Sequence, residues 1–256
     1  MDAAASQGNG VIPVGWDILA AACAAVAVGA LIQSVAGYGL GLLSGPMLAA
    51  LDPVLVPAPV LLVTVVLGLF IMLRERGAVA WRQVGMATLG RLSGAIGAAA
   101  LLASVNLALF YVVFGIMVLA GVGLSVAGWR ARLNDRNLVA AGIGSGIMGT
   151  FASIGAPPIL LLYQGADMVR ARGTLAVFFG CGALMSVAAL AGFGQVARDD
   201  FVLAGLLLPS IVVGFALAGP VSRAVDRRVL RWFALGASTL VAVYLVVRGV
   251  LTLVSS

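Results

Sequence analysis

The sequence predicts an all-α polytopic membrane protein made of two inverted-topology repeats, each a broken-helix hairpin followed by three transmembrane helices. The composition supports the membrane assignment, because 62% of the 256 residues are hydrophobic and only 9% are charged. The mean hydropathy is +1.17, whereas about a quarter of the residues in an ordinary soluble domain are charged. Two glycine- and proline-interrupted apolar stretches and the placement of the arginines support the repeat.

The first repeat is expected over residues 15–129, after an N-terminal tail of residues 1–14. A helix that spans the bilayer needs about 20 apolar residues. The first candidate covers 15–36 and continues into the interrupted segment GYGLGLLSGPML, which ends near residue 51. Full spans are expected at 55–73, 84–103 and 107–129. The long first arm, 15–36, could also cross the membrane by itself.

The second repeat is expected over residues 138–253, after a cytoplasmic central loop of residues 130–137. Its interrupted segment contains TFASIGAPPILLLY, where Pro157 and Pro158 remove backbone donors and prevent one continuous helix. In a bilayer, such a break is tolerated only where it is buried in protein or lines a polar cavity. We therefore expect a polar ligand at this break. Full spans should follow at 173–194, 201–220 and 229–253.

The two interrupted segments are related by a constant offset. Gly37 and Pro46 recur 112 positions later as Gly149 and Pro158. Gly68 and Gly180 keep the same offset. Interrupted segments at matching places in two halves indicate the binding site of a secondary transporter. The alternative is two ordinary kinked spans, since glycine and proline are common in membrane helices.

The basic residues predict the topology. All 15 are arginines, and twelve of them gather at 74–82, 130–136, 170–172 and 223–231, which should be cytoplasmic. The apolar stretch 138–165 has basic residues on both flanks, so it should enter and leave on one side. Its 28 residues allow two arms of about 14, each roughly 21 Å long. The segment 15–51 would then begin and end outside, and the two hairpin tips would meet near mid-membrane.

Several classes of protein are disfavoured by what the sequence lacks. It contains no histidine and no Walker, Rossmann or nucleophile-elbow pattern, and no carboxylate falls within a predicted span. An intramembrane enzyme is therefore not expected. Cys23 and Cys181 are isolated, so we expect no metal site and no cofactor. The preference of basic residues for cytoplasmic loops explains the arginines, so binding to nucleic acid is not expected.

Arg91 is the most informative single residue. It lies nine positions after Arg82, which places it near the bilayer centre at about 13 Å along a helix. A charge there is costly unless it faces protein or water. A guanidinium group matches the oxygens of a sulfonate, so Arg91 is a candidate anion ligand. The alternatives are snorkelling to the cytoplasmic surface or a structural contact with a carbonyl.

The remaining candidate binding residues surround the two breaks. Hydroxyl and amide groups could donate hydrogen bonds to an anion, and half-helix N-termini near Pro46 and Pro158 would add positive dipole ends. Alternatively, the hydroxyls bond back to their own helices. Tyr163 and Trp232 are expected at membrane interfaces. The predicted substrate-binding set is Arg91, Gln33, Ser34, Gly37, Tyr38, Gly39, Ser44, Gly45, Pro46, Gly149, Thr150, Ser153, Gly155, Ala156, Pro157 and Pro158.

These segments resemble the sulfite exporter TauE/SafE family of membrane permeases. The resemblance rests on Gly37-Tyr38-Gly39 with Pro46-Met47-Leu48, and on the glycine-spaced run 142–149 followed by 154–158. It covers almost the whole chain. Ser153 and Ala156 depart from the pattern, where glycine is expected. The resemblance implies transport of sulfite, sulfonates or related organosulfur anions.

We therefore expect an exporter of such anions in the bacterial inner membrane, with a small anionic substrate and the lipid bilayer as partners. The anion would bind between the two broken helices near mid-membrane. A homodimer is also compatible with the sequence. The alternatives are an uptake permease for another small carboxylate or sulfur oxyanion, and a non-transporting scaffold subunit.

Overall fold

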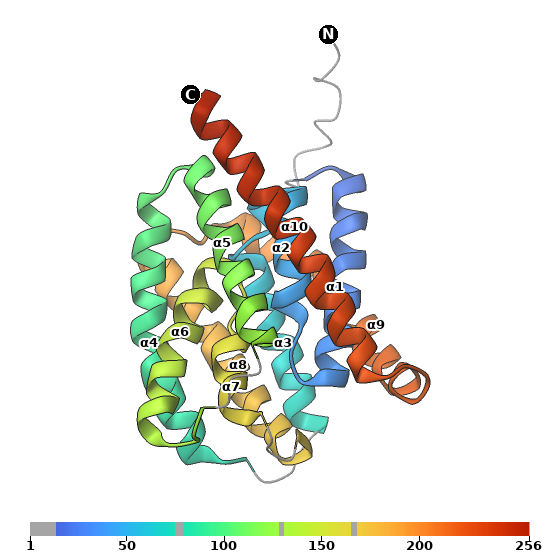
Figure 1. Ribbon diagram of the computed structural model, residues 1–256. Coiled ribbons are helices and arrows are strands. Elements are labelled where there is room, and N and C mark those ends of the chain that lie inside the picture. Colours follow the sequence, from blue (N-terminus) through green and yellow to red (C-terminus); the bar gives the residue numbers. More distant parts are fainter. Residues whose placement is uncertain (1–13, 75–78, 128–130, 165–167, 256) are drawn as a thin grey trace.

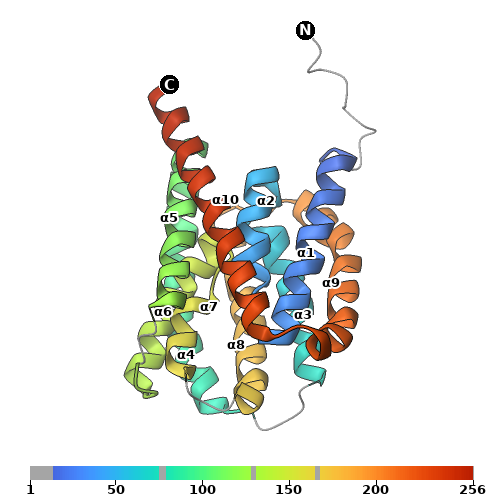
Figure 2. The same cartoon turned by 45° about the vertical axis from the view of Figure 1, so that its right-hand side comes forward.

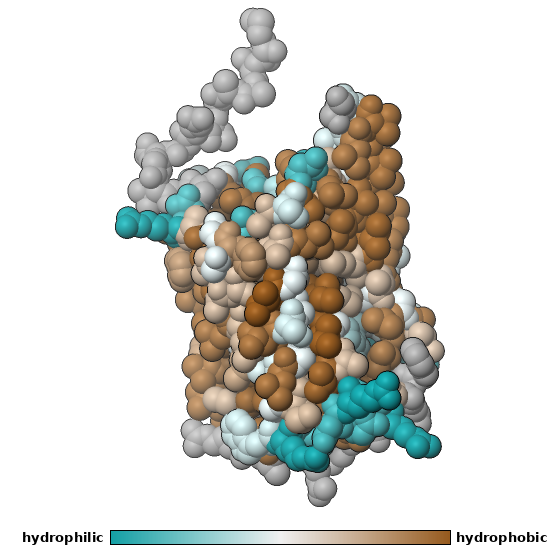
Figure 3. Space-filling view, turned by 90° about the vertical axis from the view of Figure 1, so that its left-hand side faces the viewer, coloured by the Kyte–Doolittle hydropathy of each residue, from teal (hydrophilic) through white to brown (hydrophobic). Residues whose placement is uncertain are grey.

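The computed structural model describes residues 14–74, 79–127, 131–164 and 168–255. This part of the chain is helical and contains no strand. Seven of its helices are long and apolar enough to cross a membrane. Hydrophobic side chains cover much of the face in Figure 3, and hydrophilic residues gather toward its two ends. The predicted all-α polytopic membrane fold is confirmed. Among the arginines that predicted the topology, Arg76 and Arg130 lie outside the described residues.

The helices follow the predicted order. The first half holds α1 (Trp16–Ala36), α2 (Gly45–Leu51), α3 (Ala58–Arg74), α4 (Trp81–Ser104) and α5 (Leu107–Val126). The second half holds α6 (Asp135–Ala152), α7 (Ala156–Tyr163), α8 (Met168–Gly192), α9 (Arg198–Ala224) and α10 (Arg227–Ser255). A π-helical turn, Leu40–Ser44, precedes α2, and a 3₁₀ turn, Pro53–Leu55, precedes α3.

Each half begins with a helical hairpin. The start of α1 and the end of α2 lie at the end of the molecule where α10 finishes (Figures 1 and 2). The start of α6 and the end of α7 lie at the opposite end, where the backbone N–H of Ala131 donates to the carbonyl of Leu161 at 3.4 Å. The segment 138–165 therefore turns back as expected. Its arms are unequal, however, with 18 residues in α6 and 8 in α7, and α1 is long enough to span by itself.

The first break lies at the start of the interrupted segment 37–48. The chain turns at Gly37 (φ 86°) and Gly39 (φ 141°), and Pro46 sits in the first turn of α2. Proline is tolerated there because the N–H groups of a first turn have no partner within the helix. α2 itself begins at Gly45, as a half-helix start near Pro46 requires, and the π-helical turn Leu40–Ser44 extends the helical path back toward the break. The second break agrees better: α6 ends at Ala152 and α7 begins at Ala156.

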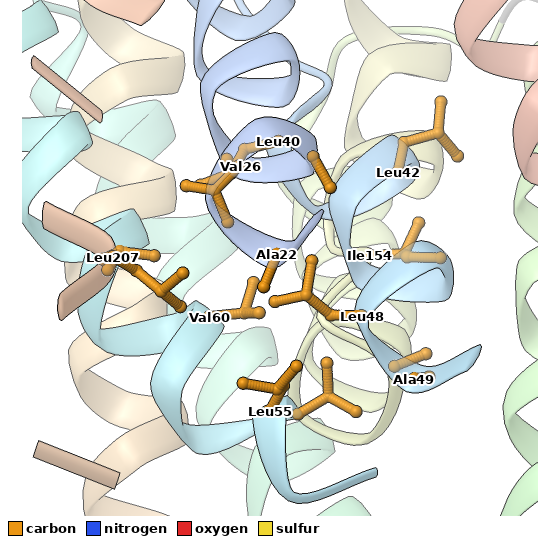
Figure 4. Packing of buried hydrophobic residues seen from close by; sticks show 14 of the residues in the cluster. Ala22, Val26, Leu40, Leu42, Leu48, Ala49, Leu55, Val60, Ile154 and Leu207 are labelled. Carbon is orange, nitrogen blue, oxygen red and sulfur yellow. The ribbon is translucent and has the colours of Figure 1, made fainter. Parts of the chain in front are cut away.

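The two breaks touch each other. A Cβ on Gly41 would lie 1.7 Å from the carbonyl oxygen of Ser153, and a Cβ on Gly45 would lie 3.0 Å from that of Ala152. Only glycine at position 41 lets the backbones approach this closely. Ile154 lies within the apolar cluster that surrounds the first hairpin (Figure 4). The hairpins therefore form the centre of the fold.

The outer helices make reciprocal contacts. A Cβ on Gly115 of α5 would lie 2.8 Å from the carbonyl oxygen of Ala242 on α10. A Cβ on Gly249 of α10 would likewise lie 2.8 Å from the carbonyl oxygen of Ala108 on α5. Exchanged contacts of this kind are what a two-fold axis between two halves produces. The inverted repeat itself stays a prediction.

Gly68 on α3 and Gly180 on α8, which the 112-residue offset relates, lie against each other. A Cβ on Gly68 would be 3.1 Å from the Cα of Gly180. Small residues at this crossing let the two backbones pack closely, as is common between membrane helices. The crossing lies between the two halves of the chain.

Candidate anion site

Arg91 is buried inside the helix bundle. It lies on α4, and only 3% of the residue is exposed. Its Nη1 donates a hydrogen bond to the hydroxyl of Ser145 on α6 at 2.6 Å. Its guanidinium carbon lies 5.3 Å from the ring centre of Phe178 on α8, within cation–π range. Three helices therefore hold the charged group, which faces protein as the sequence analysis expected.

Three glycines provide the space for this side chain. A Cβ on Gly149 would lie 2.7 Å from Nη2 of Arg91, and a Cβ on Gly155 would lie 2.6 Å from Nη1. At Gly182 on α8, a Cβ would lie 1.9 Å from Nε. Gly149 and Gly155, at the second break, thus pack against Arg91. The proline motif alone did not indicate this role. Together they form a cradle around the guanidinium.

No negative charge balances Arg91 within the described residues. The ion pair of Arg82 with Asp135 is exposed at the surface, and no aspartate or glutamate is among the buried side chains of the described residues. The Nε of Arg91 has no hydrogen-bond partner there. Burying a charge without a partner costs several kcal/mol, and a bound anion would offset this cost.

A small cavity lies beside Arg91 and both breaks. Its volume is about 30 Å³, room for about two water-sized spheres. Seven of the predicted binding residues line it: Arg91, Gln33, Tyr38, Gly39, Ser153, Gly155 and Ala156. We call this space the inner cavity. It brings residues of both hairpins together with α4.

Other lining residues were not predicted. Among these lining residues Thr64 on α3 is polar, but its hydroxyl already donates a hydrogen bond to the carbonyl of Val60 at 2.7 Å. Phe179 and Ala183 add an apolar wall from α8. A threonine within an apolar span was the only local signal, and nothing in the sequence placed α3 or α8 beside the breaks. The remaining lining residues are Gly41, Leu42, Leu61 and Ile154.

Three predicted hydroxyl groups lie outside the lining of the inner cavity. Ser44 donates to the carbonyl of Ala25 at 2.9 Å, and Thr150 donates to the hydroxyl of Ser186 at 2.7 Å. Ser34 is buried without a side-chain partner among the described residues. The first two bond to neighbouring helices and not back to their own helices, which was the alternative expectation.

The other predicted residues shape the backbone. Gly37 ends α1 in a left-handed conformation, and its N–H donates to the carbonyl of Gln33. The side-chain oxygen of Gln33 accepts from the N–H of Leu40 at 3.0 Å, which bridges the first break. The positions that pack or begin a helix, rather than line the inner cavity, are Gly45, Pro46, Gly149, Pro157 and Pro158.

A larger, arginine-lined space adjoins the inner cavity. Its volume is about 550 Å³, and Arg227, Arg228 and Arg231 line it together with Tyr38 and Pro157. We call it the arginine vestibule. Tyr38 belongs to the lining of both spaces, so it stands between them. The vestibule lies near the turn from α9 to α10, at the end predicted to be cytoplasmic.

Two arginines hold the end of α1 next to this junction. Arg74 on α3 donates to the carbonyl of Ser34 at 2.8 Å, and Arg172 on α8 donates to that of Val35 at 3.1 Å. The last carbonyls of a helix carry partial negative charge and attract cations. These contacts position the Gly37–Gly39 turn and therefore Tyr38.

The sequence predicts Tyr163 at a membrane interface, but the structure buries this side chain. It is 5% exposed, and its hydroxyl donates to the side-chain oxygen of Gln83 at 2.7 Å. The bond joins α7 to the start of α4. Trp232, by contrast, is 53% exposed, as an interfacial residue would be.

The fold and the site together define a class of protein. Membrane-crossing helices surround two broken hairpins in contact, and beside them lies a buried cation for which the part of the chain that the structure describes provides no counter-charge. Broken helices that meet inside the protein are typical of secondary transporters. The structure therefore has the architecture of a membrane transporter.

Comparison with protein families identifies which one. The model of the family described as sulfite exporter TauE/SafE matches residues 21–245. The chain belongs to this family, which confirms the resemblance, and it is a membrane transporter. Searches of the curated proteins and of the solved structures gave no match.

Proposed function

We propose that the protein moves sulfite, an organosulfonate or a related small oxyanion across the bacterial inner membrane, chiefly outward. The observation that carries the proposal is Arg91, a buried guanidinium that lines a cavity beside both breaks and for which the described residues provide no counter-charge. A ligand with negatively charged oxygens would supply both the missing charge and hydrogen-bond acceptors.

The arginine vestibule supports the same proposal. Three arginines line the larger space that adjoins the inner cavity through Tyr38. A cleft lined by one sign of charge raises the local concentration of the opposite ion, and this effect weakens with salt. The vestibule would therefore collect anions from the predicted cytoplasmic side.

The test is flux in proteoliposomes that contain the purified protein. Sulfite, taurine and a small carboxylate are loaded separately, and their release is compared with that from protein-free vesicles. We expect faster release of sulfite, and release of taurine if the transporter also accepts organosulfonates. Selective release of the carboxylate would favour the alternative permease, and no release of any anion would favour a scaffold.

A further inference from the structure

We infer that Ser153 is a specificity-determining residue whose hydroxyl donates a hydrogen bond to the anion held by Arg91. The inference rests on the proposed function and assigns a second donor to the same site. Three observations carry it: the backbone of Ser153, the state of its hydroxyl and its position in the inner cavity.

The backbone of Ser153 suits glycine better than serine. Ser153 ends α6 with φ 60° and ψ 16°, and it is the only non-glycine residue with positive φ in the described ranges. α1 ends in the same left-handed region, but there the residue is Gly37. A side chain strains this conformation, whereas glycine adopts it freely. Serine at this position therefore destabilises the end of α6.

The hydroxyl of Ser153 adds a second cost. Only 8% of the residue is exposed, and its Oγ has no hydrogen-bond partner among the described residues. Two other buried hydroxyls of α6, those of Thr150 and Ser145, do have partners. A buried polar group without a partner is destabilising. Glycine would remove both costs, and an acceptor atom of a ligand would remove the second.

The position of Ser153 indicates what that acceptor is. Ser153 lines the inner cavity together with Arg91, and Gly155, two residues later, abuts the Nη1 of Arg91. An oxyanion bound at this cavity would lie next to both side chains, because Arg91 and Ser153 both belong to its lining. Arg91 can only donate hydrogen bonds, and the serine hydroxyl can donate one more. One anion with several oxygens on one centre can accept from both residues.

The test compares Ser153→Gly and Ser153→Ala with the wild-type protein. The probe is sulfite, and the measurements are the half-saturating concentration for flux and the Tm in detergent. Both variants should weaken sulfite binding by about tenfold or more, as expected for a lost hydrogen bond to a charged group. Ser153→Gly should also raise the Tm by about 2–4 °C through relief of strain. Stability and affinity then change in opposite directions, which a purely structural role would not produce.

Thr88→Ala is the matched control. Thr88 also carries a buried hydroxyl without a partner among the described residues, but it lines an apolar groove on the outer side of α4. Its replacement should leave the half-saturating concentration unchanged. Wild-type sulfite affinity in both Ser153 variants would overturn the inference and leave the proposed function intact. Absence of sulfite and taurine flux in the wild-type protein would overturn both.

Discussion

The guanidinium of Arg91 and the hydroxyl of Ser145 lie 2.6 Å apart, and the same hydroxyl donates to the carbonyl of Gly155. Ser145 therefore connects a charge on α4 to the backbone of the second break. Any movement of the α6–α7 hairpin would change the surroundings of Arg91. This connection joins the proposed binding group directly to the second break.

Gly182→Ala should displace Arg91 and abolish most anion flux. The new Cβ would lie 1.9 Å from Nε, so the guanidinium must leave its cradle. Flux of sulfite in proteoliposomes measures the effect, and we expect a loss of about tenfold or more, equivalent to at least 1.4 kcal/mol. Gly97→Ala is the control, because a Cβ on Gly97 meets nothing within 4 Å. Equal flux in the two variants would contradict the role of Gly182 in making room for Arg91.

Cysteine accessibility tests the second hairpin. In a variant without Cys23 and Cys181, single cysteines at Leu133 and Gln164 should react with an impermeant reagent added from the cytoplasmic side. Leu133 is 43% exposed before α6, and Gln164 lines the arginine vestibule after α7. A cysteine at Gln195, exposed between α8 and α9, should react only from the other side. Labelling of Leu133 and Gln164 from opposite sides would mean that 138–165 crosses fully.

Much of the fold could be predicted because membrane helices carry strong local signals. Apolar length gave the spans, the proline pair at 157–158 located the second break, and basic flanks indicated that its segment turns back. The first break was placed within the segment 37–48, but Pro46 did not locate it more closely, because a proline in the first turn of a helix does not interrupt it. The actual turn needs Gly37 and Gly39 with positive φ, and a glycine-rich stretch does not reveal which glycine adopts it.

The site was predicted only in part. Arg91 stood out because a charge within a span is rare, and Tyr38 and Ser153 followed from their closeness to the breaks. Thr64 and Phe179 were missed because they reach the inner cavity only through the packing of α3 and α8. Ser44 and Thr150 were included for their chemistry, but their hydroxyls bond to other groups of the protein. The sequence shows which residues carry hydrogen-bond donors, but it does not show toward which groups those donors point.

Membrane voltage should drive the flux. No aspartate or glutamate is buried among the described residues, and Asp52 caps the turn after α2 by accepting from the N–H of Val54. Asp52 and Asp167, which lie next to the two hairpins, are the candidate proton sites, and Asp167 lies outside the described residues. Outward movement of an anionic charge gains about 2.3 kcal/mol per 100 mV, and a divalent anion gains about twice that. Valinomycin and potassium set the voltage in proteoliposomes.

Sulfite efflux should then rise as the inside becomes more negative. A matched series holds voltage at zero and imposes a pH gradient, with substrate protonation controlled. Flux that ignores voltage and follows the pH gradient would show that a proton is coupled to transport. Asp52→Asn and Asp167→Asn would then identify the group.

The most direct measurement is sulfite flux through Arg91→Ala and Arg91→Lys, compared with the wild-type protein in proteoliposomes at equal protein content. The account predicts that Arg91→Ala remains inserted and folded but loses sulfite flux, because the cavity no longer offers a positive charge. Arg91→Lys should recover only part of it, because an ammonium group cannot replace the planar guanidinium that donates to Ser145. Wild-type flux from Arg91→Ala would contradict the central role of Arg91.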